Sequence, residues 1–211
     1  MPSRVSPRLL ALLEAEPLAS ATALDVGTGH GPLALAIAPR CRRVIGIDRD
    51  PGAIDEARRR GRLARAENVE FAVADAEDVE YARFAPDLVV AHLCMSDAIV
   101  ERAGRALAPG QVLAFVAFHA DQWRETGRRS RFAYDEDQMT ALLDRAGFQA
   151  ESLEVDREEL RFASVEEGLA AAIGLAERWR ADGRWVRYLK FLEDGGRTLT
   201  RAHLVVKARR R

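Results

Sequence analysis

Three glycines recur at alternate positions early in the chain, Gly27, Gly29 and Gly31, and an acidic residue, Asp25, stands two positions before the first. Because glycine has no Cβ atom, such a segment can turn sharply and bring its backbone close to a bound ligand. A second acidic residue, Asp48, follows Gly27 by 21 positions. At this spacing a carboxylate can accept the hydroxyls of a ribose. The pattern therefore indicates a site for a nucleotide or nucleoside.

The glycine spacing separates two kinds of nucleotide site. A dinucleotide fingerprint reads Gly-x-Gly-x-x-Gly, whereas here only one residue separates the second and third glycines. Asp25 stands where it could meet a positively charged amino group, and a third acidic residue, Asp75, could accept from an adenine amino group. Structural alternatives exist for both residues. Asp25 could cap the amides of its own loop, and Asp75 could begin a helix.

Short apolar runs alternate with helical patterns along the chain, which is typical of a parallel sheet with helices on its faces. Strands are predicted at 23–26, 43–48, 68–74, 87–91, 111–118, 148–155 and 198–208. Helices are predicted at 5–16, 32–38, 51–66, 97–107, 135–146, 164–180 and 185–193. The predicted fold class is α/β, a Rossmann-like doubly wound sheet that is mostly parallel with an antiparallel last strand and has helices on both faces.

One domain is expected over 1–211, with an N-terminal helix in 1–20 and a cofactor-binding core over 20–155. Residues 119–134 and 160–195 are expected to be substrate-side or lid additions. For the part of the second addition from Trp179 to Phe191, core packing is the favoured alternative. Asp87 is predicted to be structural, and Arg209 to Arg211 are predicted to form a solvated tail rather than a nucleic-acid arm.

Five segments, in order and at the right spacing, resemble the motifs of the class I S-adenosylmethionine-dependent methyltransferases. The resemblance covers residues 20–155, and its segments are Leu24–Gly31, Val44–Asp50, Phe71–Glu77, Phe84–Val90 and Arg105–Leu113. It implies an enzyme that binds S-adenosylmethionine and releases S-adenosylhomocysteine.

The resemblance also implies roles for individual residues. Asp25 would hold the methionine amino group of the cofactor, and Asp48 would bind the ribose hydroxyls. Arg49 would lie against the adenine face, Asp75 would accept from the adenine amino group, and the amide of Ala76 would donate to the ring. The segment packing beneath the cofactor would comprise Gly27, Thr28, Gly29 and Gly31.

The loop after the fourth predicted strand, residues 91–97, opens beside the transferred methyl group in the family that the chain resembles. His92 in this loop is the predicted general base, because an imidazole titrates near neutral pH. The alternative is that His92 only lines the cofactor pocket. Cys94 is interpreted as structural, because the Pro-Cys context of enzymes that methylate pyrimidines at C5 is absent.

Residues 119–134 are rich in basic and aromatic side chains and follow the fifth predicted strand. They could recognise an acidic or aromatic substrate, or they could form a plain surface loop. The substrate candidates in this segment are His119, Trp123, Arg131 and Tyr134.

Composition narrows the function classes. With 32 basic and 33 acidic residues the net charge is -1, which makes a nucleic-acid partner unexpected. No apolar run approaches the ~20 residues of a membrane helix, no signal-peptide pattern is visible, and the two cysteines lack metal-ligand spacing. We therefore expect a cytoplasmic protein without a bound metal and without membrane insertion. Oligomeric state is not predicted.

The predicted function is methyl transfer from S-adenosylmethionine to an oxygen, nitrogen or carbon of a small molecule. One alternative is methylation of RNA or protein, and another is a non-catalytic module that keeps the fold and the cofactor. A nicotinamide-dependent oxidoreductase is the weakest competitor.

Overall fold

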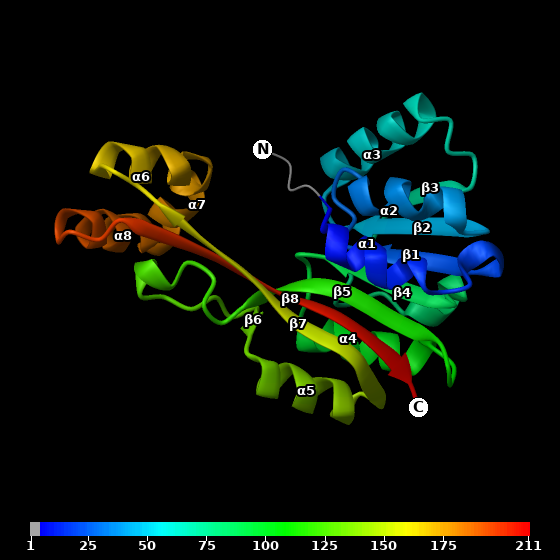
Figure 1. The fold of residues 1–211 in the computed structure, drawn as a ribbon. Coiled ribbons are helices and arrows are strands. Elements are labelled where there is room, and N and C mark those ends of the chain that lie inside the picture. The colour runs from blue at the N-terminus through cyan, green and yellow to red at the C-terminus, as the bar shows by residue number, and fades with distance from the viewer. Residues whose placement is uncertain (1–4) are drawn as a thin grey trace. The chain divides into compact units, whose positions relative to one another are not determined.

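The structure is a computed structural model that describes residues 5–211. Among these residues one sheet has the strand order β3-β2-β1-β4-β5-β8-β7 (Figure 1). The short strand β6 is not part of this order and pairs with β5. The strands are β1 (Thr22–Val26), β2 (Arg43–Asp48), β3 (Val69–Val73), β4 (Leu88–His92), β5 (Val112–His119), β6 (Ala133–Tyr134), β7 (Phe148–Arg161) and β8 (Thr198–Arg210).

The first strands of the sheet are parallel. Leu24 of β1 lies opposite Ile45 of β2 and Val89 of β4, and β3 and β5 continue the parallel pairing on either side. All the residues of β1 are buried, as expected for a strand covered on both faces. Because the strands are parallel, their carboxyl ends lie along one edge of the sheet. The glycine segment follows β1 at this edge, and Asp48 is the last residue of β2.

The last strand runs in the opposite direction. Arg210 near the end of β8 exchanges backbone hydrogen bonds with Gly110 and Gln111 just before β5, whereas Thr200 near its start accepts from the backbone of Trp123, beyond the end of β5. The predicted fold class, a mostly parallel Rossmann-like sheet with an antiparallel last strand, is confirmed.

The described residues divide into two compact units. We call residues 5–117, 136–154 and 205–211 the sheet unit, and residues 118–135 and 155–204 the helical unit. The strands β5, β7 and β8 each begin in one unit and end in the other. Both expected additions, 119–134 and 160–195, fall in the helical unit.

Helices cover the two faces of the sheet in the sheet unit (Figure 1). The helices here are α1 (Pro7–Glu14), α2 (Pro32–Ile37), α3 (Pro51–Leu63), α4 (Asp97–Ala106) and α5 (Glu136–Arg145). Apolar side chains of α1, α2 and α3, such as Leu9, Leu33 and Ile54, share one buried cluster with Val90 and Val116 of the strands. Fully burying a side chain of this size stabilises a fold by about 1.5–3 kcal/mol, so this cluster is the main core of the unit.

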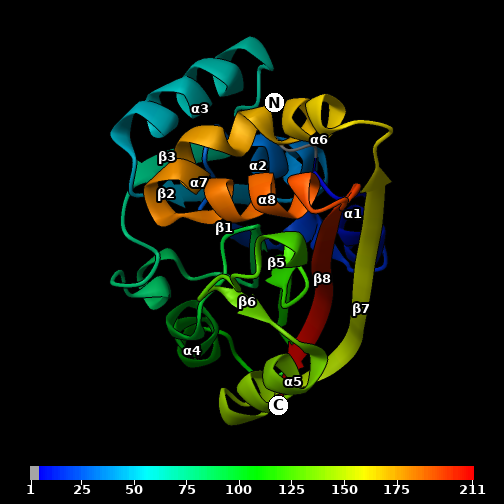
Figure 2. The same ribbon diagram turned by 90° about the vertical axis from the view of Figure 1, so that its left-hand side faces the viewer.

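The helical unit contains α6 (Val165–Ala172), α7 (Ala176–Asp182) and α8 (Arg184–Glu193), which are labelled in Figure 2. Its core contains Trp123, Trp179, Tyr188, Leu192 and Leu199, which are all buried. The prediction that the stretch from Trp179 to Phe191 packs a core is thus confirmed.

The prediction of one continuous helix over 164–180 is wrong. Ser164 does cap the start as predicted, because its Oγ accepts from the amide of Glu167 at 3.2 Å. However, α6 ends at Ala172, and a 3₁₀ turn over Ile173–Leu175 separates it from α7. This turn contains Gly174, a residue that disfavours a helix interior by about 1 kcal/mol relative to alanine.

The C-terminal arginines do not form the predicted tail. Arg210 belongs to β8, and its side chain donates to the carbonyls of Gly104 and Gly147. Arg211 donates to the carbonyl of Phe148 at 2.7 Å. The sequence pattern could not show this, because the acceptors are backbone carbonyls that only the fold brings within reach.

Candidate active site

The glycine segment forms the turn between β1 and α2 in the sheet unit. Gly27, Gly29 and Gly31 have φ angles of 66°, 54° and 81°, a region that residues with a side chain rarely adopt. A Cβ atom on Gly27 would lie 2.2 Å from Sγ of Cys94, so this glycine packs tightly on the loop after β4. A Cβ atom on Gly29 would meet nothing within 4 Å. The backbone at Gly29 is therefore open to a ligand.

Asp25 lies beneath this turn and is 1% exposed. Its Oδ2 accepts from Oγ1 of Thr28 at 2.6 Å and from the amide of Ala34 at 3.1 Å. Burial raises the pKa of the Asp25 carboxyl to about 7, because a charge is costly to hold away from water. Asp25 thus makes the loop-capping contacts of the structural alternative, and its role toward an amino group stays a prediction.

Asp48 ends β2 and reaches back to the glycine segment. Its Oδ2 accepts from the amide of Gly29 at 2.9 Å, and its Oδ1 accepts from the amide of Asp50 at 3.0 Å. The amide of Thr28 also donates to the carbonyl of Ile47 at 2.9 Å. The end of β2 and the open part of the glycine turn are therefore held together.

The segment after β3 lies beside Asp48, because the amide of Ala74 donates to its carbonyl at 2.9 Å. In this segment Oδ1 of Asp75 accepts from the amide of Glu77 at 2.8 Å, which is the contact of a turn-initiating carboxylate. Ala76 is buried, and its carbonyl accepts from the hydroxyl of Tyr81. Arg49, by contrast, is exposed.

Negative charge is concentrated around the glycine turn. Burial raises the pKa of the Cys94 thiol to about 11, and the charges of Asp48, Asp25 and Glu77 add to that effect. The charge of Asp48 also contributes to the raised pKa of Asp25. A thiol held in its neutral form is a poor nucleophile, which agrees with the structural interpretation of Cys94. The carboxylates instead suit a ligand that carries positive charge.

S-Adenosylmethionine is such a ligand, because it combines an ammonium and a sulfonium with a ribose and an adenine. The open backbone at Gly29 and the carboxylates of Asp25, Asp48 and Asp75 fit its groups. Among residues 5–211, no group of three or more His, Cys, Asp or Glu side chains is arranged to hold a metal ion.

His92 ends β4 and contacts the N-terminal helix. Its Nε2 accepts from the amide of Ser6 at 3.1 Å, so this nitrogen carries no proton in the observed arrangement. Ser6 is the N-cap of α1, and its hydroxyl accepts from the amide of Leu9. His92 therefore joins the start of α1 to the loop after β4, a role that the sequence did not suggest. Its role as a base stays a prediction.

The four substrate candidates lie in the helical unit in different surroundings. Trp123 is 7% exposed and packs against Trp179 at a ring distance of 5.3 Å, so it belongs to the core. His119 is also buried, and its Nδ1 accepts from the amide of Asp121. Arg131 is exposed and lies over the ring of its neighbour Phe132, and Tyr134 is half-buried in β6.

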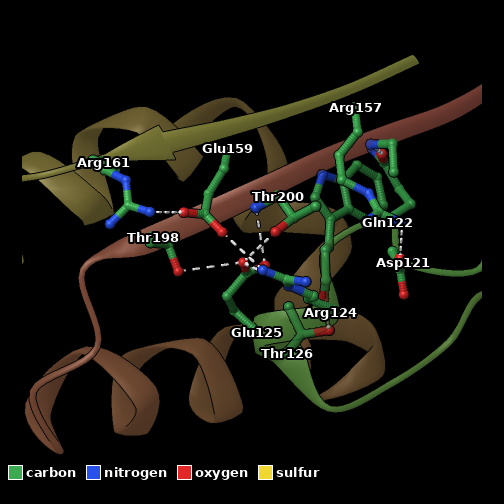
Figure 3. A network of polar contacts seen from close by, with 12 residues as sticks. Asp121, Gln122, Arg124, Glu125, Thr126, Arg157, Glu159, Arg161, Thr198 and Thr200 are labelled. Atoms are coloured by element: carbon green, nitrogen blue, oxygen red, sulfur yellow. Dashed lines mark hydrogen bonds and ion pairs between the residues drawn. The ribbon is translucent and has the colours of Figure 1, made fainter. Parts of the chain in front are cut away.

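A buried carboxylate fixes the segment 119–134 to β8 (Figure 3). The side chain of Glu125 is 3% exposed. It accepts from the amide of Thr200 at 3.0 Å, from the hydroxyl of Thr200 at 2.5 Å and from the hydroxyl of Thr198 at 3.4 Å. The sequence offered no signal for Glu125, which stands in a polar stretch without periodicity. The segment is therefore anchored and is not a plain surface loop.

His203 of β8 is a further residue that no sequence motif indicated. Its ring lies 5.9 Å from the ring of Phe118, and it is half-buried. Burial lowers its pKa. The sequence distinguishes His203 from other residues only as one of the four histidines of the chain.

Among residues 5–211, none of the helices has the length and apolar character that a membrane span requires.

Asp87 accepts from the amide of Thr22 at 2.9 Å and from the side chain of Gln111 at 2.9 Å. These contacts confirm its predicted structural role.

Comparisons with known proteins identify the family of the chain. Residues 23–110 match a family described as a methyltransferase domain. A malonyl-[acyl-carrier protein] O-methyltransferase of Geobacter sulfurreducens is 33% identical over 182 residues, which cover 75% of this chain and 67% of the relative.

Solved structures share the fold. The YcgJ protein of Bacillus subtilis has a TM-score of 0.75 at 16% identity, with 98% of this chain and 99% of that chain covered. A SAM-dependent methyltransferase of Methanosarcina mazei has a TM-score of 0.63 at 17% identity, with 99% of each chain covered. The chain belongs to the S-adenosylmethionine-dependent methyltransferases and is an enzyme of that family.

Proposed function

We propose that the protein transfers a methyl group from S-adenosylmethionine to an oxygen, nitrogen or carbon of a small-molecule acceptor. The observation that carries this proposal is the open glycine turn at Gly29, flanked by the carboxylates of Asp25 and Asp48. When bound, the cofactor supplies a methyl group activated by a sulfonium. The residues of the chain bind and orient the reactants, which can provide much of the rate enhancement in a displacement of this kind.

The proposed contacts with the cofactor are those that the family resemblance implies. Asp48 would accept the ribose hydroxyls, Asp25 would interact with the amino group, and Asp75 would accept from the adenine amino group. The amide of Ala76 would donate to the adenine, and Arg49 would lie against its face. Thr28 would support Asp25 through the hydroxyl hydrogen bond described above.

The chemical class of the methyl acceptor is inferred from a relative and from the net charge. The Geobacter relative is named for a malonyl group on an acyl carrier protein, so a carrier-bound carboxylate is one acceptor to test. A net charge of -1 does not favour RNA. A chain that binds the cofactor and methylates no acceptor would instead be a non-catalytic module of the same fold.

Calorimetric titration with S-adenosylmethionine tests the cofactor assignment. Replacing Asp48 by alanine should lower the affinity at least about tenfold, because the ribose hydroxyls lose a charged acceptor. Asp55→Ala is the matched control, because it removes the same charge from an exposed position on α3 and should leave the affinity unchanged. No binding to the wild-type chain, or equal affinities for wild type and Asp48→Ala, would contradict the assignment.

The acceptor is tested separately by mass spectrometry. The enzyme and cofactor are incubated with a malonyl-carrier protein, with a panel of small molecules and with total RNA, and S-adenosylhomocysteine is measured in parallel. Product in the small-molecule arm supports the proposal. Product confined to the RNA arm contradicts it, and binding of NAD in place of S-adenosylmethionine would indicate an oxidoreductase.

A further inference from the structure

Four arginines gather beside the junction of α7 and α8 in the helical unit, where these two helices pack against each other (Figure 2). Arg184 pairs with Asp182, the last residue of α7, and Arg128 donates to the backbone carbonyl of Asp182. Nε of Arg184 also donates to the carbonyl of Arg128 at 3.4 Å. A Cβ atom on Gly127 would lie 3.8 Å from the guanidinium of Arg187. We call this group, completed by one arginine of α7, the arginine cluster: Arg128, Arg178, Arg184 and Arg187.

Positive charge in the arginine cluster exceeds the negative charge beside it. Among residues 5–211, one ion pair joins a member of the cluster to a carboxylate, the pair of Arg184 with Asp182. Burial lowers the pKa of Arg184, the charge of Asp182 opposes this effect, and the charges of Arg128 and Arg178 add to it. The side chain of Arg184 is 9% exposed. Like charges are therefore held together around a buried guanidinium, which costs free energy unless an anion neutralises them.

The two outer members of the cluster are accessible to a ligand. Arg178 and Arg187 are exposed, and within residues 5–211 neither pairs with a carboxylate. Other exposed arginines of the same unit do form such pairs, as Arg201 does with Glu158 at 3.6 Å. An anion could therefore bind at the cluster without first displacing a carboxylate from these two guanidiniums.

The start of α8 adds to the excess of positive charge. A helix N-terminus carries partial positive charge and favours acidic residues in its first turn, but the first turn of α8 has none and begins with Arg184. Oδ1 of Asp182 accepts from the amide of Arg184 at 3.2 Å, so one carboxylate serves both the helix start and a guanidinium. The helix start and the arginines together favour binding of an anion.

We propose that the arginine cluster binds a phosphate dianion, either free phosphate or the phosphomonoester group of a small molecule. Guanidiniums match phosphate oxygens in pairs, and two negative charges balance the cluster better than the single charge of a carboxylate. RNA fits less well, because its phosphodiesters carry one charge each and the chain has a net charge of -1. All members of the cluster belong to the helical unit, so the inference depends neither on the cofactor turn nor on the methyl acceptor.

Titrations followed by NMR test the inference. Inorganic phosphate, phenyl phosphate, acetate and oligouridylate are compared at constant ionic strength and about pH 7.5, where phosphomonoesters are dianions. The Nε–H signals of the cluster are assigned from their loss in single Arg→Gln variants, and their shifts give the dissociation constants. We expect both phosphate probes to bind at least about tenfold more tightly than acetate. Tighter binding of inorganic phosphate would identify the free ion as the ligand, and tighter binding of phenyl phosphate would identify a phosphomonoester.

A pair of double variants separates the cluster from general charge effects. Arg178→Gln/Arg187→Gln should weaken phenyl phosphate about tenfold, and Arg178→Lys/Arg187→Lys, which keeps the charges but not the forked donors, about threefold. Arg161→Gln/Arg201→Gln removes the same charge from exposed arginines of the same unit that pair with carboxylates and should leave the affinity unchanged. Circular dichroism verifies that each variant is folded.

Four results would overturn the inference. They are no shift of the cluster signals by either phosphate probe, binding of acetate as tight as that of phenyl phosphate, tighter binding of oligouridylate than of phenyl phosphate, and equal losses of affinity in the two glutamine double variants. None of these results bears on the calorimetric titration with S-adenosylmethionine, so the proposed function and the phosphate site can fail independently.

Discussion

Two single residues of the sheet unit combine a structural contact with a position at the proposed cofactor site. Asp25 caps the glycine turn through Thr28 and Ala34, and His92 holds the start of α1 through Ser6. For both residues, the observed contact gives a measurable consequence that is independent of catalysis.

Asp25 should make the stability of the protein depend on pH. Its pKa is raised from 3.8 to about 7 in the fold, so the folded chain binds a proton that the unfolded chain has lost. The contribution to stability is therefore complete below about pH 4 and disappears as the pH rises through 7. Because one pKa unit corresponds to about 1.4 kcal/mol, the difference amounts to roughly 4 kcal/mol.

Urea unfolding at a series of pH values measures this effect. Asp25→Asn keeps an acceptor for Thr28 and cannot ionise. The fall in the free energy of unfolding between pH 4 and 7 should therefore be smaller in Asp25→Asn than in wild type, by roughly 4 kcal/mol. An identical pH dependence in wild type and Asp25→Asn would show that the carboxyl titrates normally.

His92 should stabilise the start of α1. Substituting alanine leaves the amide of Ser6 without its acceptor, which should cost about 1 kcal/mol and speed hydrogen exchange at that amide. His30→Ala removes an imidazole from an exposed position and is the control. Both variants are measured in the absence of cofactor. Unchanged exchange at Ser6 in His92→Ala would argue against the contact.

At the scale of elements, the helical unit depends on the junction between β8 and the 3₁₀ turn over Arg124–Thr126. The two oxygens of Glu125 accept separately, Oε2 from the amide of Thr200 and Oε1 from the hydroxyl of Thr200. Buried donors that lose their acceptor are costly, so this junction should be sensitive to small changes.

Glu125→Ala should destabilise the protein by about 1–3 kcal/mol, and Glu125→Gln, which keeps one acceptor oxygen, should lie between the alanine variant and wild type. Glu158→Ala removes an exposed carboxylate that pairs with Arg201 at 3.6 Å and should change stability by less than about 0.5 kcal/mol. The measurement is thermal unfolding by circular dichroism. Equal effects of Glu125→Ala and Glu158→Ala would contradict a buried anchor.

At the scale of the whole molecule, three strands connect the two units. Because β5, β7 and β8 each run from one unit into the other, unfolding of either unit breaks strands that the other uses. We therefore expect one cooperative transition. The three tryptophans, Trp123, Trp179 and Trp185, all lie in the helical unit, so their fluorescence reports on that unit alone.

Cofactor binding should therefore stabilise both units together. At a cofactor concentration about 100 times the dissociation constant, stability should rise by about 2.7 kcal/mol. The melting midpoints by tryptophan fluorescence and by circular dichroism should move upward equally. A fluorescence midpoint that stays in place while the other moves would show that the units unfold separately.

The sequence by itself determined the fold class, nearly all of the strands and the residues around the glycine turn. These features are local: apolar periodicity selects strands and helices, and Gly27, Asp25 and Asp48 act at the ends of neighbouring strands. The helix break at Gly174 was the main local error, because a single glycine is often tolerated in a helix.

Only the tertiary structure decided which side chains meet across long separations. Ser6 and His92 are 86 positions apart, and Glu125 and Thr200 are 75 positions apart. Phe118 and His203 meet because β8 returns beside β5. Periodicity shows which face a residue occupies, but pairing across a sheet depends on strand order and register. The glycine turn could therefore be recognised from the sequence, whereas the contacts of His92 with Ser6 and of Glu125 with Thr200 could not.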